Sequence, residues 1–131
     1  MRMLDLWREL AEENLLKDTH GASAEEIARA EKQLGLAFAP EYRAFLSAVG
    51  ACIARGHEIV GLCPFADMNV VDVTREERVY APQAQPGWYV LEQAHMDGIV
   101  LWQDESGAVY QTAPNTPPSR VASSLAEYLS L

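Results

Sequence analysis

The first fifty residues place apolar side chains at helical spacing in three consecutive segments. The apolar stripe of the first segment consists of Leu4, Trp7, Ala11 and Leu15, and other faces carry the charged residues Arg8, Glu9, Glu12 and Glu13. This period predicts an amphipathic helix with the stripe residues on its apolar face. We expect the helix to be broken at residues 18–21, whose sequence is Asp-Thr-His-Gly.

The second segment opens with a capping signature. Glu26 follows Ser23 by three residues, a spacing at which each side chain accepts a hydrogen bond from the backbone N–H of the other residue. Gly35 is placed to end this helix in a left-handed conformation. The expected buried stripe is Ile27, Ala30 and Leu34.

The third segment has the features of a helix that starts at a proline. Pro40 suits the first turn, and Glu41 suits the positive end of the helix dipole. Gly50 follows the last apolar position and is expected to end the helix. The inward-facing residues are expected to be Tyr42, Phe45, Leu46 and Val49.

After residue 50 the pattern changes to short strands and turns. Residues 52–54 and 58–62 are expected to be short strands around Arg-Gly-His at 55–57. Segment 67–80 is ambiguous, because its valines favour a strand whereas Thr74 and Glu77 have the spacing of a second capping box. We therefore expect a helix for the latter half of this segment.

The last fifty residues predict an antiparallel sheet followed by a short helix. Strands are expected at 88–93, 98–103 and 108–112, with a polar hairpin turn at 104–107. Proline-containing loops are expected at 81–87 and 115–118. Ser124 with Glu127 predicts a third capping box ahead of a helix carrying Leu125, Tyr128 and Leu129. Helices, then strands, then a helix is an α+β order.

The composition fits one globular domain over residues 1–131. The chain is 49% hydrophobic and has a formal net charge of -9. This charge repels polyphosphates, so nucleic acids and anionic membranes are expected to be poor partners. Its two cysteines, Cys52 and Cys63, match no zinc or redox spacing and are expected to be half-buried thiols in a reducing compartment. We find no secretory signal or membrane-length apolar stretch, and expect a cytoplasmic location.

The sequence offers little for catalysis. His57 neighbours Glu58, but adjacent strand residues point to opposite faces and would not share a metal ion. His95 and Asp97 could share a side, yet further ligands are not evident. Cys52 or Cys63 with His57 could form a dyad, but no orienting group is evident. We expect no metal, no cofactor and no enzymatic activity.

Charge is unevenly distributed along the chain. Residues 81–131 carry five acidic residues and one basic residue, and no lysine or arginine occurs between Val79 and Ser119. These acids either solvate a sheet edge and discourage pairing with other sheets, or form a negative surface that steers a basic partner. Trp88, beside a proline loop, is either a core residue, which we favour, or an exposed interface anchor. The candidate partner-binding residues are Trp88, Glu92, Asp97, Asp104 and Glu105.

Several of these segments together resemble the SMI1/KNR4 (SUKH) family. The resemblance rests on the capped helix and its Leu-Gly stop at 22–36, the Pro-x-Tyr-x-x-Phe-Leu pattern at 40–46, the hairpin at 97–102 and 107–110, and the closing helix at 124–129. It covers roughly residues 3–130. It implies a single α+β domain in which a curved antiparallel sheet is packed by N-terminal helices and a short C-terminal helix.

The resemblance also implies function. Many bacterial members are immunity proteins that neutralise polymorphic toxins, often nucleases, by direct binding, and fungal relatives regulate cell-wall assembly through protein contacts. We therefore expect an immunity protein for a basic toxin domain, with a regulatory or scaffolding adaptor as the alternative and an unrecognised enzyme using His57 or His95 as a third reading. We expect a monomer or a weak homodimer.

Overall fold

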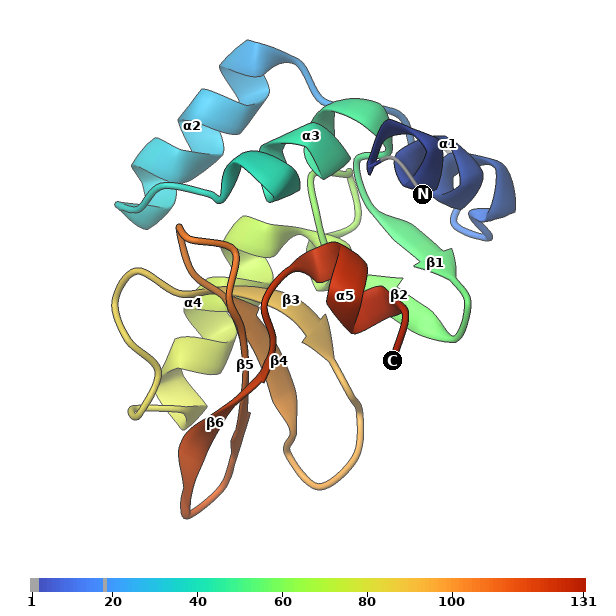
Figure 1. Cartoon of the computed structure of the whole chain (residues 1–131). Coiled ribbons are helices and arrows are strands. Elements are labelled where there is room, and N and C mark those ends of the chain that lie inside the picture. Colours follow the sequence, from blue (N-terminus) through green and yellow to red (C-terminus); the bar gives the residue numbers. More distant parts are fainter. Residues whose placement is uncertain (1–2, 18) are drawn as a thin grey trace.

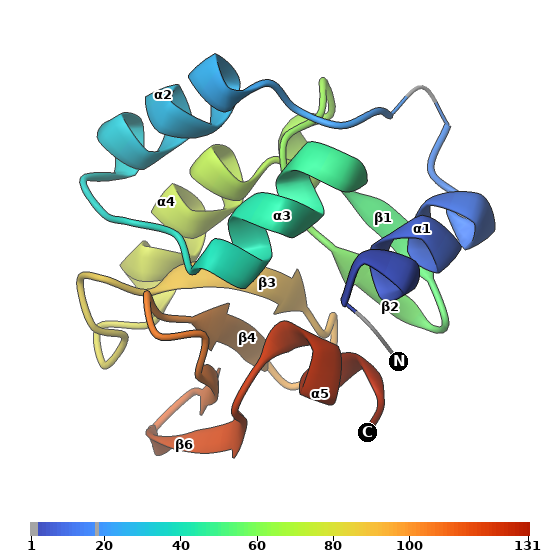
Figure 2. The same ribbon diagram turned by 45° about the horizontal axis from the view of Figure 1, so that its top comes forward.

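The structure is a computed structural model that describes residues 3–17 and 19–131, so part of the expected break at Asp18 lies outside the described residues. Helices α2 and α3 lie over one end of a four-stranded sheet, whereas α4 and α5 lie on different sides of it (Figures 1 and 2). The elements are, in order, α1 (Met3–Glu13), α2 (Ala24–Leu34), α3 (Pro40–Ala48), β1 (Cys52–Ala54), β2 (His57–Ile59), η1 (Ala66–Met68), α4 (Val70–Tyr80), β3 (Tyr89–Gln93), β4 (Val100–Gln103), β5 (Val109–Ala113), β6 (Thr116–Ala122) and α5 (Leu125–Leu129).

Helix α1 forms where expected but turns a different face to the core. Trp7 is fully buried, and Leu6 and Leu10 are buried with it. Leu4 and Leu15 are exposed, and Leu15 lies beyond the end of the helix, so the expected stripe is wrong except at Trp7. The buried stripe is shifted by about one residue from the expected one and fits the helical period almost equally well. Which of the two stripes is buried depends on where the neighbouring elements pack.

Helices α2 and α3 confirm the expected caps. The Ser23–Glu26 capping box is present, Gly35 ends α2 in the left-handed region with φ 67°, and Pro40 lies in the first turn of α3. The hydrogen bonds of the box also lower the pKa of Glu26, chiefly through the backbone N–H of Ser23. The expected stripes of both helices are buried.

Strands β1 and β2 form an antiparallel hairpin in which Ala54 pairs with His57. Its two central residues, Arg55 and Gly56, both have positive φ, at 55° and 78°. Positive φ at both central residues is the requirement of the type I′ turn, whose twist matches that of the flanking strands. The second strand is shorter than the expected 58–62.

Helix α4 starts earlier than expected and uses a different cap. Asn69 caps it by accepting a hydrogen bond from the N–H of Val71. The expected Thr74–Glu77 box is therefore wrong. Thr74 is buried in mid-helix, where its hydroxyl accepts from the N–H of Val90 on β3. The valines favour a strand only locally, and burial of the helix face overrides that preference.

The four-stranded sheet is antiparallel with the order β3-β4-β5-β6. The expected loop at 115–118 is wrong beyond Asn115, because Thr116 starts strand β6. Pro117 and Pro118 are tolerated there since β6 is the edge of this sheet, where an N–H donor is not needed. All of β4 is buried, so both faces of the sheet are covered at this strand.

Candidate protein-binding site

Trp88 belongs to the core. Its residue surface is only 4% exposed, and its ring stacks on Tyr110 at a centroid distance of 4.2 Å. Core packing, which the sequence favoured, is therefore confirmed, and the alternative of an exposed anchor is wrong. Its backbone carbonyl also accepts a hydrogen bond from Arg78 of α4.

Glu92 is likewise internal rather than part of a surface. It is 7% exposed and lies on β3 at the junction of three elements. Its Oε1 lies 2.9 Å from His57 Nδ1 and accepts a hydrogen bond from the Tyr128 hydroxyl, and its Oε2 accepts from the N–H of Glu58 at 2.6 Å. The carboxylate thus joins β2, β3 and α5.

The cluster around Glu92 does not have the properties of a nucleophilic centre. Burial, followed by the hydrogen bond to Glu92, raises the pKa of Tyr128 well above its usual value. Burial also raises the pKa of Cys52 to about 12, which disfavours its thiolate. The His57 ring is bound to Glu92. The arrangement is one of hydrogen bonds that hold the C-terminal helix.

Neither histidine pairs in the structure with the carboxylate that neighbours it in the sequence. His57 pairs with Glu92, and His95 Nε2 lies 3.0 Å from Glu58 Oε2. Both pairs connect β2 to β3 or to the turn after it. Sequence spacing could not show this, because the contact depends on how two separate sheets meet. No group of three or more potential metal ligands is found among the described residues.

Asp104 and Glu105 occupy the turn between β4 and β5. Asp104 accepts hydrogen bonds from the N–H groups of Ser106 and Ala108 and from the Tyr110 hydroxyl. Partial burial opposes its charge, but these bonds and the Ser106 hydroxyl outweigh it and lower the pKa of Asp104. Glu105 is exposed at the tip.

Three of the five sequence candidates meet at one end of the sheet, which we call the proximal end. Trp88, Asp104 and Glu105 line a hollow of about 680 Å³ together with residues 35–37 and 85–87. Asp97 lies at the opposite end, in the turn between β3 and β4 (Figure 1). The exposed acidic candidates therefore do not form one continuous surface.

Sequence reasoning missed Glu41 as an organising residue. This buried carboxylate accepts hydrogen bonds from Gln103 Nε2 at 3.0 Å and from the N–H groups of Leu125 and Ala126 at 2.6 and 3.0 Å. It therefore ties α3 to β4 and to the start of α5. The only signal in the sequence was that Glu41 lies in the first turn of a helix. A favourable interaction between its carboxylate and the helix dipole already explains a glutamate at that position.

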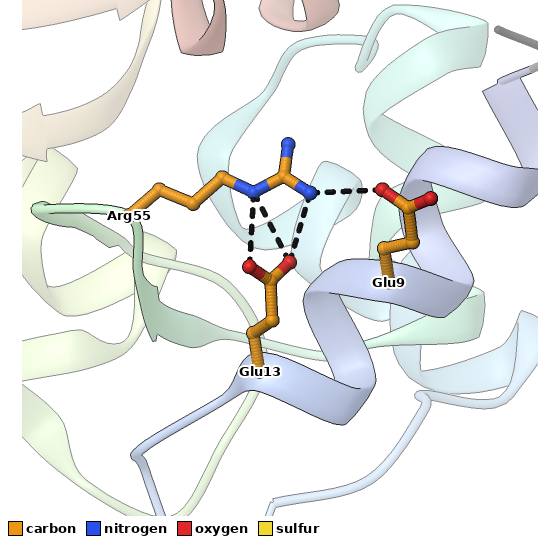
Figure 3. Close-up of polar contacts among 3 residues, drawn as sticks. All are labelled: Glu9, Glu13 and Arg55. Carbon is orange, nitrogen blue, oxygen red and sulfur yellow. Dashed lines mark hydrogen bonds and ion pairs between the residues drawn. The ribbon is translucent and has the colours of Figure 1, made fainter.

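A second unexpected cluster joins α1 to the β1–β2 hairpin. Arg55 reaches Glu13 at 2.8 Å and Glu9 at 2.9 Å, and both glutamates lie on one face of α1 (Figure 3). All three side chains remain partly exposed, so the pairs orient the helix more than they stabilise it.

Within the described residues, every helix is too short or too polar to cross a membrane.

The comparisons assign the chain to a family. None of the curated proteins compared with the chain matches it. A family model described as "SMI1-KNR4 cell-wall" matches residues 2–129, which is nearly the full length. The α+β architecture with antiparallel sheets, N-terminal helices and a short C-terminal helix fits that assignment. The chain belongs to the SMI1/KNR4 (SUKH) family.

Proposed function

We propose that this protein is an immunity protein that neutralises a polymorphic toxin by direct binding. The observation that carries the proposal is the family match over residues 2–129. The family is a generally non-catalytic one, which is consistent with action through binding. The cluster around Glu92 supports the same reading, because its groups are engaged in holding α5.

The charge of the chain supports a basic partner. A net charge of -9 attracts a positively charged surface over several ångströms and accelerates association at low ionic strength. A nuclease must present basic groups to a polyanion, so a nuclease domain is the toxin class that the charge favours. An acidic protein can occupy such a surface without being a substrate.

The test is a protection assay with the neighbouring gene. The product of the neighbouring gene is expressed in a sensitive host with and without the full chain, and the proposal predicts that this product is a toxin. We expect growth to be restored, and we expect the purified pair, with the toxin inactivated at its catalytic residue, to bind more slowly as salt rises. A toxin that kills equally with and without the chain contradicts the proposal.

A reversal of charge tests the electrostatic part separately. Changing Asp97, Asp104 and Glu105 together to lysine is expected to slow association and weaken its salt dependence. A triple variant that binds and protects as well as the wild type would show that these carboxylates do not steer the partner. A constitutive cellular partner, with no toxin encoded nearby, would instead indicate the adaptor function.

A further inference from the structure

A mainly apolar groove lies at the end of the sheet opposite Asp104, which we call the distal end. Its lining residues come from the C-terminal end of α4, from the distal ends of β4 and β5, and from the β3–β4 and β5–β6 turns. The two turns lie at the bottom of Figure 1. The volume of the groove is about 290 Å³, and its lining includes Glu77, Tyr80, Gln83, Gly98 and Pro114. We call it the distal groove.

The two turns beside the groove are packed against each other. A Cβ added to Gly98 would lie 2.8 Å from Pro114 Cγ, so the glycine lets the β3–β4 turn approach the β5–β6 turn. Gln83, in the loop that follows α4, donates a hydrogen bond to the carbonyl of Ala113 at 3.1 Å and so attaches this loop to the end of β5. Contacts within the fold therefore fix the shape of the groove.

Two large apolar side chains are left in solvent at this end. Tyr80, which lines the groove, is 75% exposed. Met96, two residues before Gly98 in the same turn, is 63% exposed. Tyrosine and methionine are enriched in protein interfaces. Tyrosine provides a large contact area at low cost in conformational entropy, and the flexible methionine side chain adapts its shape to a partner. Neither side chain contributes to the core of this chain.

The charge around the groove selects the chemistry of its occupant. Glu77 lines it, Asp97 is exposed beside Met96, and no lysine or arginine occurs between Val79 and Ser119. Arg78 is directed elsewhere, because its guanidinium donates to the carbonyls of Pro86 and Trp88. A second copy of this chain would bring like charges together, whereas a cationic surface would be attracted.

We propose that the distal groove, with Tyr80 and Met96 on its border, is the docking surface for a protein partner that inserts an apolar side chain flanked by lysine or arginine. The proposal rests on the proposed function in that the expected partner is a toxin domain. It goes further by naming the surface and separating it from Asp104, Glu105 and the proximal hollow.

Site-specific photo-crosslinking in the source organism tests the surface without assuming the partner. The crosslinking amino acid p-benzoylphenylalanine replaces Tyr80 or Met96 in the full chain, and Leu15 or Glu105 in the controls. Leu15 is a matched control because it is a large apolar residue that is 71% exposed away from this end. We expect one adduct from positions 80 and 96 and none from 15 and 105.

The adduct's partner is then purified and its binding to variants is measured. We expect Tyr80→Ala and Met96→Ala each to raise the dissociation constant about tenfold or more, mainly through faster dissociation. Asp97→Lys is expected to slow association about threefold or more at low salt. The matched controls, Leu15→Ala and Glu12→Lys, change exposed residues at or beside α1 and are expected to change either quantity less than about twofold. The unfolding midpoint of each variant shows whether it is folded.

The outcomes separate the two proposals. An adduct with a basic protein that is not a toxin, together with weakened binding of Tyr80→Ala, supports the docking surface and contradicts the toxin function. Three results overturn the docking surface. They are adducts from positions 15 or 105 alone, adducts with a second copy of the chain, and the lack of any adduct from position 80. Full-strength binding by both Tyr80→Ala and Met96→Ala overturns it as well.

Discussion

The two ends of the four-stranded sheet both carry acidic residues, but these residues have opposite surroundings. At the proximal end, Glu41 and Asp104 are surrounded by donors from the same chain. At the distal end, Asp97, Tyr80 and Met96 are exposed around a mainly apolar groove. A carboxylate that already accepts several internal hydrogen bonds has little left to offer a partner. The comparison therefore assigns a stabilising role to the carboxylates of the proximal end, and it leaves those of the distal end open for the docking proposed above.

The largest effect on stability is expected at Glu41. Glu41→Ala removes the acceptor for Gln103 and for the N–H groups that start α5, and it leaves buried donors unpaired. We expect the free energy of unfolding to fall by about 2–4 kcal/mol, measured by urea denaturation. Glu41→Gln, which keeps the shape and one acceptor oxygen, should lose less. A loss below about 0.5 kcal/mol for Glu41→Ala would remove the proximal end's structural role.

A smaller loss is expected at Glu92, between the two ends. Glu92→Gln weakens the contacts with His57 and Tyr128 but retains an acceptor for the N–H of Glu58. We expect a loss of about 1–3 kcal/mol, with α5 less protected in amide hydrogen exchange. Tyr128→Phe is the matched control, because it removes one of these bonds and keeps the ring. Unchanged exchange in α5 would show that the cluster does not hold this helix.

The contribution of Asp104 should depend on pH. Because its pKa is lower in the folded than in the unfolded chain, its charge stabilises the fold fully above the unfolded value, and this contribution is lost as pH falls through the folded value. We expect Asp104→Asn to be less stable than wild type by about 1 kcal/mol at pH 7. The difference should shrink below a pH of about 4. A difference that stays constant down to pH 2.5 would contradict the role of the charge.

The smallest effects on stability are expected at the exposed tips of the two ends. Asp97→Lys and Glu105→Lys should each change the free energy of unfolding by less than about 0.5 kcal/mol, because neither side chain is buried. Chemical denaturation at neutral pH measures both. A loss above about 1 kcal/mol at Asp97 would mean that the distal turn also holds the fold, and the contrast between the ends would disappear.

The sequence predicted local features where neighbouring residues supply the cause. The Ser23–Glu26 box and the stop at Gly35 involve bonds across three or four residues, so spacing alone identifies them. The resemblance to the SMI1/KNR4 family, since confirmed, came from the same kind of signal. By contrast, Thr74 and Glu77 have the same spacing as a capping box but lie in mid-helix, because Asn69 offers an earlier cap.

The candidate site was predicted only in part. The sequence showed that residues 81–118 are acidic and contain no lysine or arginine. It favoured a core position for Trp88 but could not show that Glu92 points inward, because both faces of the sheet are covered at β3 and β4 and alternation no longer marks the solvent side. Nor did it single out Tyr80 or Met96, since an apolar residue at a helix end or turn is buried or exposed according to its neighbours.

The sequence by itself determined the α+β order, the two caps of α2 (the Ser23–Glu26 box and Gly35), the negative charge and the family. The tertiary structure decided which carboxylates are internal and which remain open. Glu41 meets the start of α5 across 84 residues of chain, and Glu92 meets His57 across 35. Such pairings depend on how helices and sheets pack, and the free energy of burying a charge makes each internal carboxylate acceptable only where that packing supplies its donors.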